Sequence, residues 1–340
     1  MDKNPTISQH FLICIFLSLI LLLISVSSCI FISAKVNPFL REKEPLKEVF
    51  VSGKGKDKIL MIDISGIISE AGGSGVSGVF SEEDMVASIK EQLEKTKEDS
   101  RIKAIIMRIN SPGGTVTASD IIHNEIKKFK EGKKIKVVSC MMDVGASGAY
   151  FIAMASDKVI AHPTTLTGSI GVIFENFNVE GLFSKLGIKE TSIKSGDKKD
   201  IGSPFRAITE EERKILQEIN YSLYSRFIDV VDEGRKELDR EDIKRLADGR
   251  VYSAKQALEE KLIDKIGYLD DAIEIAKEES GIAEAKVVMY KRPGVYANNI
   301  YSKLFIQQPV SLNLLNLGSR KEISSYLTPK FMYLWAPGDF

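Results

Sequence analysis

Apolar positions divide the chain into one long unbroken run and a series of shorter patterned runs. Residues 11–32, FLICIFLSLILLLISVSSCIFI, form a run of 22 residues without a charged side chain. At about 1.5 Å per helical residue, such a run crosses a hydrocarbon core of about 30 Å. A core helix of this length would have a polar face, whereas this segment has only scattered serines and cysteines. The pattern predicts a transmembrane anchor over residues 11–33, preceded by a short tail at 1–10.

The form of this anchor has two interpretations. VSSC at 26–29 resembles a lipoprotein-processing box, which would make Cys29 a lipidated N-terminus, whereas the apolar IFI that follows favours a continuing span. Lys3 precedes the run and several cations mixed with glutamates follow it, so charge gives no orientation. Residues 34–56 carry mixed charges, two prolines and two glycines, which is typical of a linker.

Beyond the linker, short apolar runs alternate with helical patterns. Helices are predicted at 81–99, with Ser81 as its N-cap, and at 117–131, where Ile122, Ile126 and Phe129 face the core. Near-continuous apolar runs are typical of strands buried on both faces of a sheet. The predicted strands are 58–66, 102–109, 135–142, 158–161 and 169–173. Crossovers of this length predict a largely parallel sheet and an α/β fold.

A long amphipathic helix is predicted from Thr209, which forms a capping box with Glu212. Its apolar positions are Ile215, Leu216, Ile219, Leu223 and Phe227. Such a face either covers the sheet or contacts another subunit.

Charge and cysteine content exclude some classes of protein. Lys and Arg number 47, as do Asp and Glu, so the net charge of zero argues against a nucleic-acid partner. Cys140 is the only cysteine outside the anchor, so no disulfide within the soluble part and no Cys/His zinc site can be assembled. We expect neither a metal nor a cofactor.

Two glycine-containing loops carry candidate chemistry. RINSPGGTVTASD (108–120) follows a predicted strand, and Gly113 and Gly114 can aim backbone N–H groups at a developing oxyanion, although SPGG also makes an ordinary turn. DVGASGAYFIAMASDKV (143–159) surrounds Ser147 with small residues. This serine is either a nucleophile on a tight strand-to-helix turn or a helix N-cap.

A nucleophilic serine needs a base. His10 precedes the anchor, His123 is expected at the surface of its helix, and His162 follows a predicted strand. A lysine can replace histidine where burial lowers its pKa by about 3 units. SIKSGDKKDIGSPF (192–205) offers three lysines, which by themselves are typical of a solvated turn: Lys194, Lys198 and Lys199.

Four segments taken together resemble a known family. In order they are RINSPGG, GASGAYFIAMASDKVIAHPTTLTGSIGV, KSGDKKDIGSPF and DGRVYSAKQALEEKLIDKIG. They resemble the serine/lysine signal peptide peptidases of bacteria, peptidase family S49, over residues 57–275, and MYLWAPG resembles that family's C-terminal signature. The resemblance implies a Clp/crotonase-like fold of repeated ββα units in a twisted sheet. It also implies a peptidase domain at 57–290, a C-terminal segment at 291–340 and a closed homo-oligomer.

The resemblance also implies a role for each matching residue. Ser147 of GASGAY is the nucleophile, and Lys199, at the lysine position of the SG-x-x-K motif, is the general base. Ser169 of TGSIG orients the lysine, and Gly113 and Gly114 supply the oxyanion hole. AHPTT departs from the ANPGT-like versions common in the family, so we interpret its histidine as packed near the end of the sheet.

The expected function is that of a membrane-anchored serine endopeptidase. It would degrade hydrophobic peptides such as cleaved signal peptides through an acyl-enzyme, with its catalytic domain outside the cytoplasm of a bacterial cell. A crotonase-fold acyl-CoA enzyme is one alternative, because an oxyanion loop also suits a thioester enolate, and a non-catalytic membrane scaffold is another. The base can come from the same chain or from a neighbouring subunit.

Overall fold

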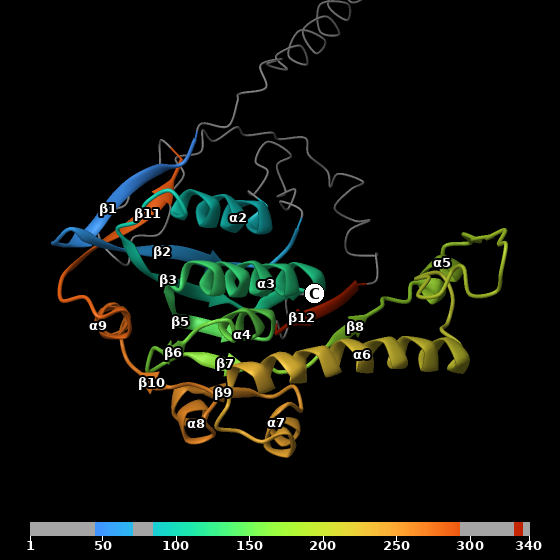
Figure 1. Cartoon of the computed structure of the whole chain (residues 1–340). Coiled ribbons are helices and arrows are strands. Elements are labelled where there is room, and N and C mark those ends of the chain that lie inside the picture. The colour runs from blue at the N-terminus through green and yellow to red at the C-terminus, as the bar shows by residue number, and fades with distance from the viewer. Residues whose placement is uncertain (1–44, 71–83, 293–329, 336–340) are drawn as a thin grey trace, which may run out of the picture. The chain divides into compact units, whose positions relative to one another are not determined.

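The central sheet is largely parallel and contains most of the buried strands. The computed structural model describes residues 45–70, 84–292 and 330–335. Its strand order is β1 (Lys47–Gly53), β11 (Ala285–Lys291), β2 (Asp57–Ser65), β3 (Ile102–Ser111), β5 (Lys136–Ala146), β6 (Lys158–Ala161) and β10 (Lys265–Ile266) (Figure 1). Beyond its pairing with β6, β5 pairs with β7 (Leu166–Gly168), which in turn pairs with β9 (Val251–Ser253). Only the β1–β11 and β7–β9 pairs among these are antiparallel, which confirms the predicted α/β class.

Helices cover both faces of this sheet. Along β2, Leu60 and Ile62 point into a core shared with α2 (Met85–Thr96) and α3 (Val116–Lys133). The alternate residues Ile59 and Met61 point into a second core, against α9 (Leu269–Ser280). Side chains of a strand alternate between the two faces, so a strand that is apolar at every position requires this three-layer arrangement.

A second, antiparallel sheet joins distant parts of the chain. Its order is β4 (Gly113–Thr115), β12 (Lys330–Leu334) and β8 (Ile173–Glu175). Ile68 bridges Gly114 on the side of β4 that β12 leaves free. The C-terminal strand therefore lies against the glycine-rich loop that follows β3.

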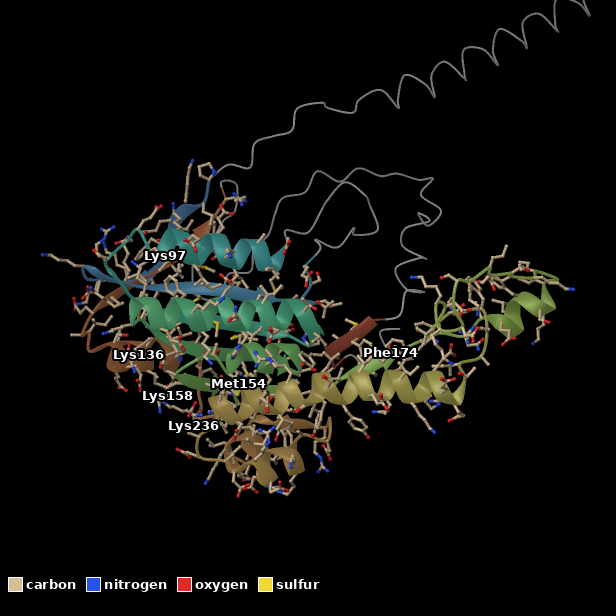
Figure 2. All side chains as sticks on the ribbon, turned by 45° about the vertical axis from the view of Figure 1, so that its right-hand side comes forward. Lys97, Lys136, Met154, Lys158, Phe174 and Lys236 are labelled. Carbon is tan, nitrogen blue, oxygen red and sulfur yellow. The ribbon has the colours of Figure 1, made fainter. Side chains whose placement is uncertain are left out.

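The long helix α6 (Glu210–Gly234) begins as predicted, with Thr209 as N-cap and a capping box to Glu212. In its C-terminal half an apolar face is buried, with Phe227, Ile228, Val230 and Val231, whereas Ile219 in its N-terminal half is 42% exposed. Residues 176–209, which we call the arm, contain α5 (Glu180–Lys185) and extend beyond the N-terminal end of α6 (Figure 2). Three short helices complete the described part: α4 (Gly148–Ala153), α7 (Arg240–Leu246) and α8 (Ala254–Glu259).

The region assigned to a linker, residues 34–56, differs from the prediction. Residues 47–53 form β1 on the edge of the central sheet, and Leu46 and Val51 are buried there. Mixed charge concealed this strand, because an edge strand exposes one face and keeps polar residues on it.

Two further element boundaries differ. The strand expected at 169–173 does not form, because Gly168 and Ser169 take positive φ values of 81° and 48° that end β7. Helix α2 is capped by Asp84, whose carboxylate accepts a hydrogen bond from the Ala87 amide at 3.2 Å. The predicted cap Ser81 lies outside the described residues, as does the predicted anchor at 11–33. Within the described ranges, none of the helices has the length and apolar character needed to cross a bilayer.

Candidate active site

Two of the predicted site residues follow neighbouring parallel strands at the same edge of the central sheet. Ser147 comes directly after β5 and Ser169 directly after β7. Ala146 and Gly168 are partners in the β5–β7 ladder, so the two serines continue from paired positions. The Ser147 amide donates a hydrogen bond to the Gly168 carbonyl at 2.8 Å, which fixes the two turns to each other.

Ser147 has a strained backbone. Its φ is 52° and its ψ is −117°, values that cost a residue other than glycine about 1–3 kcal/mol. It is 1% exposed and its hydroxyl does not cap α4, which starts at the next residue. The geometry therefore differs from an ordinary N-cap and is that of a serine presented on a sharp strand-to-helix turn.

The glycine-rich loop approaches this turn closely. Gly113 has a φ of 106°, and its amide donates to the Ser111 hydroxyl at 3.1 Å. A Cβ at Gly148 would overlap the Ser119 hydroxyl and lie 3.2 Å from the Gly114 amide nitrogen. The backbones at 114 and 148 are thus adjacent beside Ser147, which suits an oxyanion hole made from their two amides.

Sequence reasoning missed Gly148. The signal was available in its position, because the first amides of a helix have no intrahelical acceptor and Gly148 opens α4 directly after the serine. The two predicted glycines also differ in the availability of their amides for an oxyanion. The Gly113 amide already donates a hydrogen bond to the Ser111 hydroxyl.

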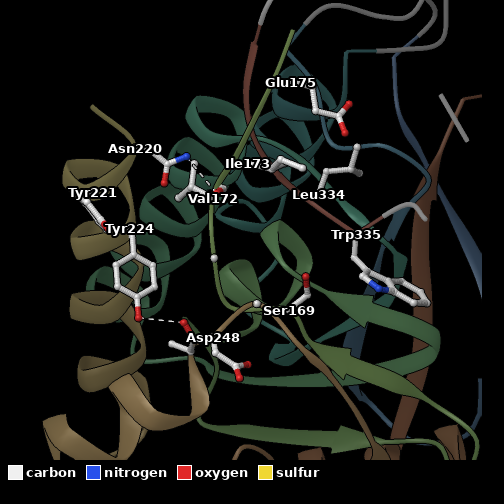
Figure 3. A pocket seen from close by; sticks show the side chains of 13 residues that line it. Ser169, Val172, Ile173, Glu175, Asn220, Tyr221, Tyr224, Asp248, Leu334 and Trp335 are labelled. Carbon is white, nitrogen blue, oxygen red and sulfur yellow. Dashed lines mark hydrogen bonds between the residues drawn. The ribbon is translucent and has the colours of Figure 1, made fainter. Parts of the chain in front are cut away.

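Ser169 borders an open cavity of about 770 Å³. Its own amide donates to the Arg250 carbonyl at 2.8 Å, and the residue is 6% exposed. Figure 3 shows Ser169 between the α6 side chains Asn220 and Tyr224 and the side chain of Trp335, which follows β12. The cavity gives a route from solvent to Ser169.

Lys199 lies elsewhere, exposed on the arm. The next residue, Asp200, binds Arg206, which also binds Glu212 in the first turn of α6. Asn220, which reaches the cavity, lies eight residues farther along α6 (212 to 220), or about 12 Å. The structure brings together Ser147, Ser169 and the two loop glycines, and it does not bring Lys199 to them within one chain.

The three lysines of the arm differ in their partners. Lys194 pairs with Asp200 at 2.9 Å and Lys198 with Glu211 at 2.5 Å. The hydrogen bond that Lys198 donates to Glu211 raises the pKa of this lysine, so its amine keeps its proton and is less available as a neutral base. Among the residues that the structure describes, Lys199 has no ion-pair partner, so its amine is free to reach another surface.

The two histidines of the described part contact side chains other than Ser147, in different settings. The Nδ1 atom of His162 is 2.8 Å from the Thr164 hydroxyl, and its ring contacts Tyr268 edge-on at 4.8 Å. His123 is 3% exposed and meets the ring of Phe151 at 5.3 Å, so its expected surface position is wrong. It is buried because α3 packs against α4 as well as against the sheet.

In the described part of the chain, no three His, Cys, Asp or Glu side chains lie close enough together to hold a metal ion. Cys140 is buried in the core beneath α9, and burial raises the pKa of its thiol to about 12.

Comparison with known proteins identifies the family. The sequence model of peptidase family S49 matches residues 129–283, and that of Clp protease matches residues 77–167. A protein of Enterococcus faecium named as a signal peptide peptidase, SppA, is 39% identical over 254 residues, 74% of this chain and 72% of its own. The chain belongs to peptidase family S49.

Two further relatives are also peptidases by name. A protein of Synechocystis named as a protease is 42% identical over 193 residues, 57% of this chain and 69% of its own. The chloroplastic serine protease SPPA of Arabidopsis thaliana is 34% identical over 255 residues, 73% of this chain and 36% of its own. Membership in S49 makes this chain a serine peptidase by family and favours that activity over the acyl-CoA and scaffold alternatives.

Proposed function

We propose that this S49 peptidase cleaves hydrophobic peptides, such as cleaved signal peptides, with Ser147 as nucleophile and Lys199 as general base. The observation that carries the proposal is the strained backbone of Ser147, held beside the amides of Gly114 and Gly148. Strain of this kind persists where the surrounding structure fixes a reactive group.

The chemistry proceeds through an acyl-enzyme. The Ser147 hydroxyl oxygen attacks the scissile carbonyl carbon while its proton passes to the neutral Lys199 amine. The amides of Gly114 and Gly148 stabilise the resulting oxyanion. Collapse breaks the peptide bond as the lysine returns the proton to the leaving amine, and a water activated by the same lysine then hydrolyses the ester. Ser169 orients the amine in both steps, as the third group of a triad does.

We further propose that Lys199 comes from a neighbouring copy of the chain. The arm that carries it exposes large apolar side chains, an arrangement typical of a surface covered by a partner. Their exposed fractions are Phe177 44%, Leu182 56%, Leu186 64%, Ile188 48% and Ile193 100%. The open cavity beside Ser169 offers a path for the lysine of a second copy. A lysine serves as a base only where surroundings exclude water, and an assembled interface supplies such surroundings.

The anchor at 11–33 forms part of the proposal, with the catalytic domain outside the cytoplasm of a bacterial cell. Truncation should keep residues from Pro45 onward, because β1 belongs to the central sheet. We expect the full chain to sediment with membranes and the 45–340 chain to stay in the soluble fraction. Soluble behaviour of the full chain would contradict the anchor and leave the catalytic proposal intact.

The nucleophile is tested by labelling with a fluorophosphonate and by hydrolysis of an apolar peptide. Ser147→Ala should abolish labelling and lower turnover by about 10³-fold or more. The matched control is Ser156→Ala, which alters a serine that pairs with Ser139 at the end of α4. Labelling that persists in Ser147→Ala would mean that another residue is the nucleophile.

A further inference from the structure

Lys199 lies on a run of turns in the arm, and ion pairs join this run to α6. The Lys199 amide donates a hydrogen bond to the Gly196 carbonyl at 3.1 Å. The Ser203 amide donates one to the Asp200 carbonyl at 2.9 Å. These bonds connect residues of the arm with one another, so the position of the turns relative to α6 depends on the side chains that cross between them.

The guanidinium of Arg206 joins the residue next to Lys199 to the start of α6. It donates two hydrogen bonds to the Asp200 carboxylate, at 2.7 and 2.9 Å, and a third to the Asp200 backbone carbonyl at 3.2 Å. It also donates two to the Glu212 carboxylate, at 2.5 and 2.8 Å, in the first turn of the helix. An arginine can hold two carboxylates in this way because its planar group presents five N–H donors, whereas a lysine is a point charge.

Burial distinguishes this link from the neighbouring ion pair between the arm and α6. The Glu212 side chain is 2% exposed and that of Asp200 is 16% exposed, and the hydrogen bonds from Arg206 hold the pKa of both carboxyl groups below the usual range. Lys198 and Glu211 form the other pair, with side chains 39% and 71% exposed. An exposed pair of long side chains contributes little, whereas a buried carboxylate depends on its partner. The Arg206 link is therefore the one that fixes the turns.

We propose that Arg206 is a positioning residue for the general base: it holds Asp200, and with it the adjacent Lys199, at a fixed place relative to α6. The lysine then enters the site of a neighbouring copy already oriented. The inference rests on the proposed function. Orientation matters for a base delivered across an interface, because displacement of a reacting group by about 1 Å costs up to about 100-fold in rate.

Helix α6 is a suitable reference for the arm because its other end belongs to the core. Figure 1 shows α6 running from the arm to the sheet, and its 25 residues span about 37 Å. Phe227 and Val231 in its C-terminal half are fully buried, and the Phe227 ring contacts Phe151 of α4 at 5.1 Å. Turns that are fixed to the first turn of this helix are thereby fixed to the domain.

The first test measures peptide hydrolysis by full-length variants. Arg206→Gln should lower kcat about 10- to 100-fold and leave KM within about twofold, because the base is displaced and the peptide site is unchanged. Arg206→Lys should recover part of the loss, since an ammonium can bind one carboxylate but cannot hold both. Asp200→Ala should lower kcat as well, and it keeps the buried pair of Arg206 with Glu212. Wild-type kcat in Arg206→Gln would overturn the inference.

The matched control is Arg213→Gln. Arg213 lies next to Glu212 in α6 and pairs with Glu210 of the same helix at 3.6 Å, with side chains 63% and 84% exposed. This change removes an arginine–carboxylate pair that holds no part of the arm, so kcat should stay at the wild-type value. A loss equal to that in Arg206→Gln would assign the effect to the charge at the start of α6 and would overturn the positioning role.

Mixed assemblies separate positioning from a structural role. Ser147→Ala chains supply an arm and no nucleophile, and Lys199→Ala chains supply a nucleophile and no base. When the two are co-expressed, Arg206→Gln in the Ser147→Ala chain should prevent recovery of activity, because that arm must deliver the lysine. In the Lys199→Ala chain the same change should leave recovery intact. A requirement of Arg206 for folding or assembly would lower the activity of both mixtures equally.

The outcomes distinguish the inference from the proposed function. Equal recovery in both mixtures, or equal loss in both while the mixture without Arg206→Gln recovers, would overturn the inference. If that parent mixture does not recover, the lysine serves its own chain, and the kcat of Arg206→Gln by itself decides. Full activity of Lys199→Ala would contradict the proposed function. Wild-type kcat in Arg206→Gln together with an inactive Lys199→Ala would contradict the inference only.

Discussion

The two residues of the proposed catalytic pair lie in contrasting surroundings, Ser147 at the carboxyl edge of the central sheet and Lys199 on the arm. At the edge, Ser147 is buried and strained, and its turn is hydrogen-bonded to the turn before Ser169. On the arm, Lys199 is exposed, and its neighbours are held by ion pairs around Arg206. The contacts of one chain hold Ser147 in place at the sheet edge, whereas the arm leaves Lys199 exposed to solvent.

This difference indicates why the pair is divided. A nucleophile must be aligned with its oxyanion amides to within fractions of an ångström, which packed strands provide. A lysine base additionally needs a water-poor site, and an exposed arm acquires one when another copy covers it. The ion pairs of Asp200 and Glu212 with Arg206 fix the part of the arm nearest to α6 to the first turn of that helix.

The largest effect should come from one lysine of the arm, Lys199. Lys199→Ala should lower turnover by about 10³-fold, as far as Ser147→Ala, because the members of a catalytic unit act together. Peptide hydrolysis by purified full-length variants, with circular dichroism to verify folding, measures the loss.

Two controls sharpen this prediction. Lys198→Ala should retain most activity, since that ammonium is bound to Glu211 and its pKa is raised. His162→Ala should also retain most activity, since its ring contacts Thr164 and Tyr268. A loss in His162→Ala equal to that in Ser147→Ala would replace the lysine with a histidine base.

The next experiment distinguishes a lysine that acts on the serine of its own chain from one that acts on the serine of a neighbouring copy. Ser147→Ala and Lys199→Ala chains, each inactive alone, should regain activity when co-expressed. With random mixing, half of the sites keep the serine and half of those receive the lysine, so about one quarter of wild-type activity should return. Absence of recovery in assemblies verified to contain both chains would mean that each arm serves its own serine.

Much of the fold could be predicted from the sequence because its signals are local. Near-continuous apolar runs predicted β2, β3, β5 and β6, and the Thr209 capping box predicted the start of α6. The edge strands β1 and β8 escaped prediction, because β1 has a polar face and β8 has three residues. The pairing of β12 with β4 joins residues more than two hundred positions apart, a distance over which periodicity gives no signal.

The candidate site was predictable in part. The family motifs led to Ser147, Ser169 and the loop glycines, which the structure brings together at one edge. Gly148 was missed although it opens α4 directly after the serine, because its closeness to the Gly114 amide is a tertiary contact with the loop after β3. The pairing of Lys199 with Ser147 stays a prediction, since the structure of one chain contains no contact between them.

The smallest expected effect is the pH dependence of the free energy of unfolding, which should differ between the core and the region around the arm. Burial, and next the charge of Arg226, lower the pKa of His123 to about 4 from its usual 6.5. Where the arm joins α6, the hydrogen bond from Arg206 lowers the pKa of Glu212 to about 2, so its contribution to stability remains until the pH falls below about 4.5. Of these two groups, only His123 in the core should therefore change its contribution to stability between pH 8 and pH 5.

His123 should make the folded protein less stable as the pH falls. The unfolded chain takes up the proton near pH 6.5 and the folded chain only near pH 4, so stability is complete above the first value and decreases toward the second. Between pH 8 and pH 5 this amounts to about 2 kcal/mol of unfolding free energy. Urea unfolding of the full-length chain should show that decrease, and His123→Leu should remove most of it. A decrease of the same size in His123→Leu would assign the pH response to other groups, and faster proteolysis of the arm at pH 5 would assign it to the arm.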